Sequence, residues 1–268
     1  MTPSATLVPG PRPRPKGAGA RFFWGAGFFG RGLSFVLGHK RLWPWVLMPS
    51  LLTGAVVFFG TMAAWRWANA FIDARLAGHG AFVAALLWVV LFLFVVSMGY
   101  VAFLVTSMLA TAPFAGPISE RTEKLHTGQV IAVEGIGAIL RNTVRGLGHT
   151  VLELSLYIGI TLALLFLQLF LSPLAPFIWI LNVIITGYFF AFDAYDLTLG
   201  RRGKNFGQKW AFLGAHTAEG LGFGVTIALL LVVPGLGLFV PAIAACGSTL
   251  LFLEIEAAET KPDALAAP

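Results

Sequence analysis

The chain has 268 residues, of which 57% are hydrophobic and 11% are charged, and its formal net charge is +6 at pH 7. About 25% of the residues of a soluble domain are charged, so this composition excludes an ordinary soluble protein and favours an integral membrane protein. The apolar stretches are continuous and lack the ten-residue alternation of barrel strands, which predicts an all-α membrane protein. The single cysteine, Cys246, excludes an internal disulfide framework, and we expect it to be an inert packing residue.

Residues 1–20 are rich in proline, glycine and arginine, and we expect them to form a disordered, basic cytoplasmic tail. No acidic residue precedes Asp73, and a flank of this kind is typical of the cytoplasmic side of a membrane protein. Nucleic-acid binding would also explain a basic tail, but the positive-inside rule is the simpler account, so we expect no nucleic-acid partner. The aromatic residues from Phe22 to Phe29 suit a short amphipathic helix on the membrane surface.

Two long apolar runs follow and predict two long transmembrane helices. The first runs from Leu42 to Trp65, and the second falls within residues 80–119, which contain no Asp, Glu, Lys or Arg. Each run exceeds the ~20 apolar residues that cross a bilayer. Residues 66–79 between them are far less basic than the N-terminal flank, so we expect an external loop there.

The second run ends at a Pro/Gly elbow, Ala112-Pro113-Phe114-Ala115-Gly116-Pro117. We expect this elbow to end the apolar helix and Pro117 to begin a charged one, since proline at the first helical position needs no amide donor. Charged groups at such a border can line or gate an entrance. Glu120 and Lys124 stand four residues apart, however, and a plain intrahelical ion pair is the alternative. The candidate entrance residues are Pro113, Phe114, Gly116, Glu120, Arg121, Glu123 and Lys124.

Residues 128–153 suggest an amphipathic helix with a basic stripe, suited either to lipid headgroups or to guiding an anion. Two further uncharged runs then follow, each interrupted near its middle by proline and glycine. The first spans residues 154–192 and is broken at Ser172-Pro173-Leu174-Ala175-Pro176, and the second spans residues 220–253 and is broken between Val233 and Pro241. Halves of about 12 residues do not cross a ~30 Å core, so we predict two helical hairpins that partly penetrate the membrane.

Three stretches carry a family resemblance: Ala112–Glu123 (APFAGPISERTE), Tyr195–Phe206 (YDLTLGRRGKNF) and Val233–Pro241 (VPGLGLFVP), the last followed by Ala245–Thr249 (ACGST). Together they resemble the CysZ-type sulfate permeases and the related etoposide-induced-protein domain proteins. The order and spacing of the three stretches are specific, and the resemblance covers roughly Gly32 to Glu256.

The end of the chain from Glu254 onward is mildly acidic and rich in small residues, and we expect residues 257–268 to form a disordered tail. The resemblance implies one membrane domain over residues 21–256, with two long transmembrane helices and half-penetrating hairpins. It also implies assembly into a homo-oligomer in a bacterial inner membrane, with both termini in the cytoplasm. The permeases of this family are taken to pass sulfate into the cytoplasm for cysteine synthesis. The pattern departs from theirs at two places, because Trp43 and Pro44 stand at the positions of their anion-binding arginines and Ala115 replaces the asparagine of their elbow.

His39, Lys40 and Arg41 precede the first span and are the candidate substrate-binding residues, since a tetrahedral dianion needs donors and positive charge. A basic flank that only sets the topology is the alternative for these three residues. Asp196 with Arg201 or Arg202 suits an ion pair that fixes a hairpin, and Pro234, Gly235 and Pro241 suit its turn.

The sequence therefore favours a permease or channel for sulfate or a related small anion. A non-transporting membrane scaffold of the same family is the alternative. We expect no enzyme, since the motifs HExxH, CxxC and GxSxG do not occur, and no metal site. The letters of a dinucleotide fingerprint occur from Gly25 to Gly30, but no predicted strand precedes them, so we expect no cofactor.

Overall fold

The computed structural model describes residues 14–76, 81–129, 155–164, 166–168, 170–233 and 235–260. These residues are helical throughout apart from short connections, and no strand occurs among them. The amphipathic helix expected at residues 128–153 lies outside the described residues from residue 130 onward. So do Pro234, most of the N-terminal tail and residues 261–268.

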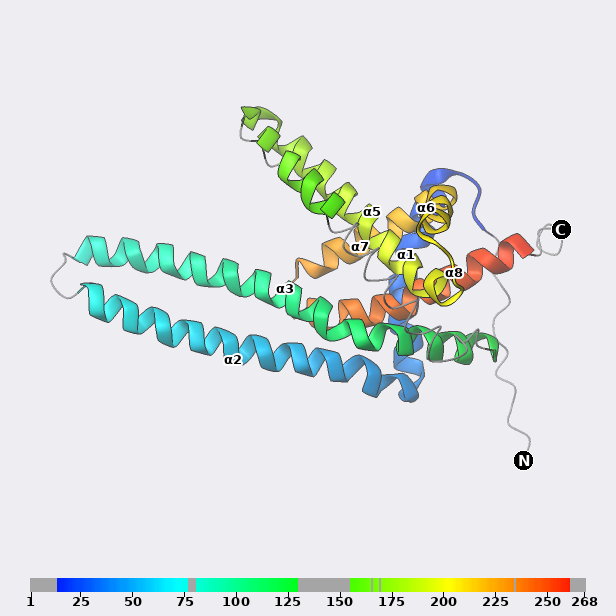
Figure 1. The fold of residues 1–268 in the computed structure, drawn as a ribbon, viewed down its shortest axis with the longest axis horizontal. Coiled ribbons are helices and arrows are strands. Elements are labelled where there is room, and N and C mark those ends of the chain that lie inside the picture. The colour runs from blue at the N-terminus through cyan, green and yellow to red at the C-terminus, as the bar shows by residue number, and fades with distance from the viewer. Residues whose placement is uncertain are drawn as a thin grey trace.

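The two predicted long helices are confirmed as α2 (Trp43–Leu76) and α3 (Ala81–Thr127), which pack along each other. Figure 1 shows them as a long antiparallel arm that projects from a helical bundle. At ~1.5 Å per residue the 34 residues of α2 extend about 51 Å, well beyond a ~30 Å hydrocarbon core. The loop expected at residues 66–79 is therefore wrong over residues 66–76, which complete α2. Large apolar side chains such as Phe58 and Phe92 point outward from the arm, as a lipid-facing surface requires.

The elbow does not end a helix, because α3 continues through both Pro113 and Pro117. The expectation of a second helix that starts at Pro117 is wrong. A proline inside a helix removes one backbone hydrogen bond and tends to bend it, and neighbouring helices can compensate for the loss. Here Ser107, before the elbow, donates to the carbonyl oxygen of Gly237 at 3.2 Å, and Ser119, after it, accepts from the hydroxyl of Thr249 at 2.7 Å. Contacts on both sides hold α3 as one element.

The bundle is built around α7 and α8, which are joined through a break. α1 packs on both of them, α5 packs mainly on α7, and α3 packs on α8. Figure 1 shows these helices gathered at one end of the α2–α3 arm, with α5 extending away as a second arm. The bounds are α1 (Ala18–Gly38), α5 (Ala175–Arg201), α6 (Phe206–Ala215), α7 (Thr217–Leu231) and α8 (Val240–Thr260). The expected boundary of the N-terminal tail at residue 20 thus lies inside α1.

Glycines allow the bundle helices to approach one another closely. A Cβ placed on Gly222 of α7 would overlap the carbonyl oxygen of Phe22 in α1, and a Cβ on Gly224 would overlap that of Gly187 in α5. Gly25 of α1 makes the reciprocal approach to the backbone of α7 at Glu219. Small residues at such crossings bring backbones together where the hydrophobic effect contributes little, as is common in membranes.

Both predicted hairpins are present. The first breaks at the turn η2 (Ser172–Leu174), and its two sides meet where the ring of Tyr157 contacts that of Phe189 at 5.3 Å. The second breaks between α7 and α8 around η3 (Leu236–Leu238), where Gly235 has a φ of 87°, a backbone conformation that favours glycine.

The helices on either side of these breaks differ in length. α8 has 21 residues and is longer than expected, because it continues past the apolar run to Thr260. Among the described residues, three segments are long and apolar enough to cross a membrane, namely Lys40–Phe71, Ala175–Arg201 and Val240–Thr260, and the bent pair α6–α7 would make a fourth. Within α3 the apolar stretch Ala85–Tyr100 is shorter. α7 alone has 15 residues.

Candidate anion site and its supporting charge network

The three predicted substrate-binding residues lie in the turn between α1 and α2, which contains the short helix η1 (Lys40–Leu42). His39 points back toward α1, because its Nδ1 donates to the carbonyl oxygen of Phe35 at 2.8 Å and its ring stacks on that of Phe35. The indole of Trp43 donates to the carbonyl oxygen of Val36 at 3.0 Å and fixes the turn from the other side. Lys40 and Arg41 are both exposed.

Arg41 lines an open pocket of about 350 Å³ together with Glu120, Arg121, Lys124 and Leu125 of α3. The structure thus brings one predicted binding residue together with three of the predicted entrance residues. Three cations and one carboxylate give this cationic pocket a formal charge of +2, from the types of residue that line it. The guanidinium of Arg121 lies 3.8 Å from the ring centre of Trp45, a cation–π contact that holds it at the wall of the pocket.

The alternative of an ion pair between Glu120 and Lys124 is not borne out, since neither residue forms an ion pair with any described residue. Both side chains are exposed. The elbow residues Pro113, Phe114 and Gly116 precede them on α3 and do not line the pocket. Phe114 packs edge-on against Trp45 at 6.1 Å between ring centres, while Pro113 is exposed and Gly116 is half-buried.

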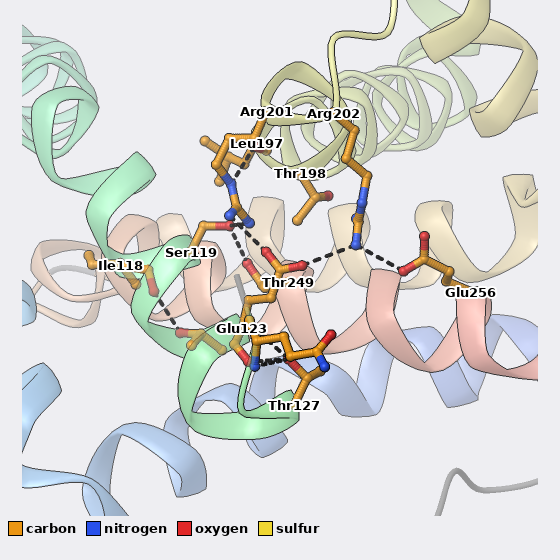
Figure 2. Close-up of polar contacts among 12 residues, drawn as sticks. Ile118, Ser119, Glu123, Thr127, Leu197, Thr198, Arg201, Arg202, Thr249 and Glu256 are labelled. Atoms are coloured by element: carbon orange, nitrogen blue, oxygen red, sulfur yellow. Dashed lines mark hydrogen bonds and ion pairs between the residues drawn. The ribbon is translucent and has the colours of Figure 1, made fainter. Parts of the chain in front are cut away.

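Glu123 lies on another face of α3 and is buried. Figure 2 shows its carboxylate between the two arginines at the end of α5. Nη1 of Arg201 lies 2.7 Å from Oε2 of Glu123, and Nη2 of Arg202 lies 3.1 Å from Oε1. The same Nη2 of Arg202 lies 2.9 Å from Oε2 of Glu256 in α8, so this network joins three helices.

Hydroxyl groups complete the network of Glu123. Arg201 donates to Ser119 at 2.9 Å, and Ser119 accepts from Thr249 of α8 at 2.7 Å (Figure 2). The guanidinium of Arg202 also lies 4.3 Å from the ring centre of Phe252. Two arginines face two carboxylates, so the network has no surplus charge and is suited to fixing helices rather than to attracting an anion.

The ion pair expected between Asp196 and Arg201 or Arg202 is wrong. Asp196 instead forms an ion pair with Lys209 of α6, and both arginines turn toward Glu123. Asp196 stands five residues before Arg201 on α5, and residues that far apart do not share a helix face, whereas α3 presents a carboxylate directly to the arginines. Ser119 and Thr249 could not be predicted as members of this network, because serine and threonine in apolar helices carry no local signal of their partner. Glu256 could not be predicted either, because it borders the stretch expected to be a disordered tail.

A second charge network surrounds Glu219, which is fully buried at the start of α7. Arg14 forms an ion pair with its Oε1 at 2.6 Å, and Arg21 of α1 lies 3.8 Å from the same oxygen. Arg14 also donates to Nδ1 of His216 at 2.9 Å, so Nδ1 is the accepting nitrogen. Nε2 of His216 therefore carries the proton and faces Glu259 of α8 at 3.1 Å. Burial lowers the pKa of His216, although the charge of Glu259 opposes that effect.

The sequence profile of the family described as sulfate transporter CysZ/etoposide-induced protein 2.4 matches residues 28–241. The chain belongs to this family. The match includes the cationic pocket, Glu123 and both network arginines, and it ends just before the part of α8 that carries Thr249 and Glu256.

Curated relatives of the CysZ family extend over most of the chain. A protein of Vibrio atlanticus (strain LGP32) named sulfate transporter CysZ is 27% identical over 249 residues, which cover 90% of this chain and 95% of the relative. A protein of the same name from Vibrio parahaemolyticus is 26% identical over 237 residues, which cover 85% of this chain and 94% of the relative. The family and the apolar helices together make this chain a multi-pass membrane protein.

Proposed function

We propose that this CysZ-family protein is a permease or channel that carries sulfate or a related small anion across the inner membrane into the cytoplasm. The observation that carries the proposal is the convergence of Arg41, Arg121 and Lys124 on one open pocket where the chain enters α2. The names of the curated relatives support sulfate as the anion.

The chemistry of the cationic pocket suits a small tetrahedral anion. Arginine offers planar forks of donors that match oxyanions, and lysine adds a mobile point charge. Glu120 shares the pocket and weakens the attraction for an anion. Such a balance favours transport, because a conducting site must bind well enough to load and weakly enough to release.

The charges also suggest an orientation. Most of the basic residues of the described chain lie at the bundle end of the molecule, and basic flanks remain in the cytoplasm. We therefore place the bundle, the start of α1 and the end of α8 on the cytoplasmic side, with the tip of the α2–α3 arm outside. The exposed apolar arms and the interrupted hairpins are consistent with assembly into a homo-oligomer, which cross-linking in membranes tests.

Uptake of labelled sulfate into liposomes that contain the purified protein tests the proposal. We expect uptake well above that of empty liposomes and expect it to saturate with sulfate. Uptake equal to that of empty liposomes, with insertion of the protein verified by protease protection, would sink the idea.

A non-transporting membrane scaffold is the second candidate. It is favoured by the pairing of Arg201 and Arg202 with Glu123 and Glu256, which leaves no surplus charge in that network. A partner that co-purifies stoichiometrically from membranes, together with absent flux of sulfate, would support the scaffold.

A further inference from the structure

An apolar groove of about 330 Å³ lies between α1, the start of α2, the end of α7 and the start of α8. Every residue that lines it is apolar, and those that form its walls include Leu33, Leu37, Trp43, Leu47, Phe239 and Ile243. The side chain of Leu37 is 59% exposed and that of Leu236 is 50% exposed, so the groove opens to the surroundings of the protein. The cationic pocket described above shares none of these residues.

Two side-chain hydrogen bonds hold the helices that form the walls of this groove in place. The indole of Trp43 donates to the carbonyl oxygen of Val36, which ties the start of α2 to α1. On the opposite side, Ser50 of α2 donates to the carbonyl oxygen of Leu238 in the α7–α8 break at 2.9 Å. The groove therefore runs from the turn between α1 and α2 toward the break of the second hairpin.

Among the described residues, positively charged side chains lie at one end of the groove. Lys40 and Arg41 lie between the lining residues Leu37 and Trp43, in a turn that exposes both side chains. Arg31, the other cation of the nearby part of α1, is paired with Glu254 and is not available. Arg41 lines the cationic pocket together with Glu120, so Lys40 is the cation of this turn that is left for the groove, and none of the residues that line the groove is a carboxylate.

We propose that the groove holds one acyl chain of an anionic phospholipid whose phosphate is bound at Lys40. An amphiphile with an apolar chain and a negative headgroup matches a groove that is apolar along its length and cationic at one end. Moving an acyl chain from the bilayer into an apolar groove gains little, because lipid tails are as apolar as leucine. The headgroup charge therefore sets the preference among lipids, and the groove sets where the chain lies.

Native mass spectrometry of the full-length protein tests this site. The protein is exchanged into micelles that contain equal amounts of phosphatidylglycerol and phosphatidylcholine with identical acyl chains. We expect one phosphatidylglycerol to be retained in preference to phosphatidylcholine. Lys40→Ala should lower that preference about fivefold, the effect expected of one basic residue at an anionic lipid, whereas Lys204→Ala, at an exposed lysine elsewhere, should not.

A second pair of variants tests the groove itself. Leu37→Trp fills the mouth of the groove and should reduce the retention of both lipids, while Leu229→Trp changes an exposed leucine of α7 outside it and should not. Equal retention of the two lipids by the native protein, or full retention by Leu37→Trp, would overturn the proposal. Neither outcome depends on sulfate flux, so this site and the proposed transport function stand or fall separately.

Discussion

Nη1 of Arg201 lies 2.7 Å from Oε2 of Glu123, and both side chains are largely buried between α3 and α5. Arg202 extends the pairing to Glu256, so one carboxylate of α3 connects α5 and α8. Removal of one partner of a buried ion pair leaves an uncompensated charge and costs about 3–5 kcal/mol, more than the intact pair contributes against apolar residues. This network therefore makes the bundle sensitive to single substitutions at its centre.

Glu123→Gln should strongly destabilise the protein, because it leaves Arg201 without its carboxylate in a buried site. Glu256→Gln is the matched control, since the side chain of Glu256 is 45% exposed and Arg202 would keep Glu123. We expect the loss of unfolding free energy to be about 3–5 kcal/mol for Glu123→Gln and under about 1 kcal/mol for Glu256→Gln. Unfolding in mixed micelles, followed by tryptophan fluorescence, measures both, and equal losses would contradict the assignment.

Gly222→Ala should destabilise the bundle, because its Cβ would collide with the backbone of Phe22 in α1. Overpacking of this kind costs typically about 1–3 kcal/mol, and a backbone neighbour cannot move aside as a side chain can. Gly60→Ala on the exposed face of α2 meets no atom within 4 Å and should be neutral or stabilising by up to about 1 kcal/mol. Thermal melts of the two purified variants compare them directly, and a neutral Gly222→Ala would contradict the close crossing of α1 and α7.

Acidification should loosen the N-terminal segment through His216. Its Nδ1 accepts from Arg14, and burial lowers its pKa, so the folded protein favours the neutral ring. The unfolded chain then binds the proton at a higher pH than the folded one, and stability falls as the pH drops below about 6.5 toward the pKa of the folded state. The charged groups that face the ring are Arg14, Arg21, Glu219 and Glu259.

Unfolding free energies between about pH 8 and about pH 5 measure this effect. We expect the native protein to lose stability on acidification and His216→Gln to lose less of it over the same range. The two proteins should therefore converge at low pH. Identical pH profiles for the native protein and His216→Gln would show that this ring does not titrate as described.

Cys246 should resist thiol reagents in the folded protein, since its side chain is fully buried in α8. Labelling with a maleimide should be slow in micelles and rapid after denaturation. A Cys246→Ala, Ser34→Cys double variant places the only thiol on the exposed face of α1 and should label rapidly in both states. Rapid labelling of native Cys246 would show that α8 is not packed as described.

The apolar runs were sufficient to predict the long helices and both hairpins, because lengths of uncharged sequence and clusters of proline and glycine report local structure directly. The elbow shows where such signals fail. Pro113 and Pro117 suggest a helix end, but the contacts of Ser107 and Ser119 with the second hairpin hold α3 continuous. Contacts between distant segments decided that outcome, and no local pattern contains them.

The C-terminal acidic residues show the same limit for the candidate site. Glu254, Glu256 and Glu259 suggested the beginning of a mildly acidic tail, yet each pairs with a basic side chain of another element, namely Arg31, Arg202 and His216. Charge types and rough locations could be predicted, whereas the identity of each partner depends on how the helices cross. The cationic pocket was predictable in part. Arg41 and Lys124 were each expected at the border of a span, but the sequence did not indicate that the two residues meet in one pocket.

Sulfate uptake by charge variants in liposomes tests the central claim most directly. The native protein should take up labelled sulfate well above empty liposomes. The double variant Arg41→Ala, Lys124→Ala should lose about tenfold or more of that uptake at low sulfate, because it removes two charged donors of the cationic pocket. Lys204→Ala, at an exposed lysine outside the pocket, should transport as the native protein does. Native flux that does not exceed empty liposomes, or full flux by the double variant, would contradict the account.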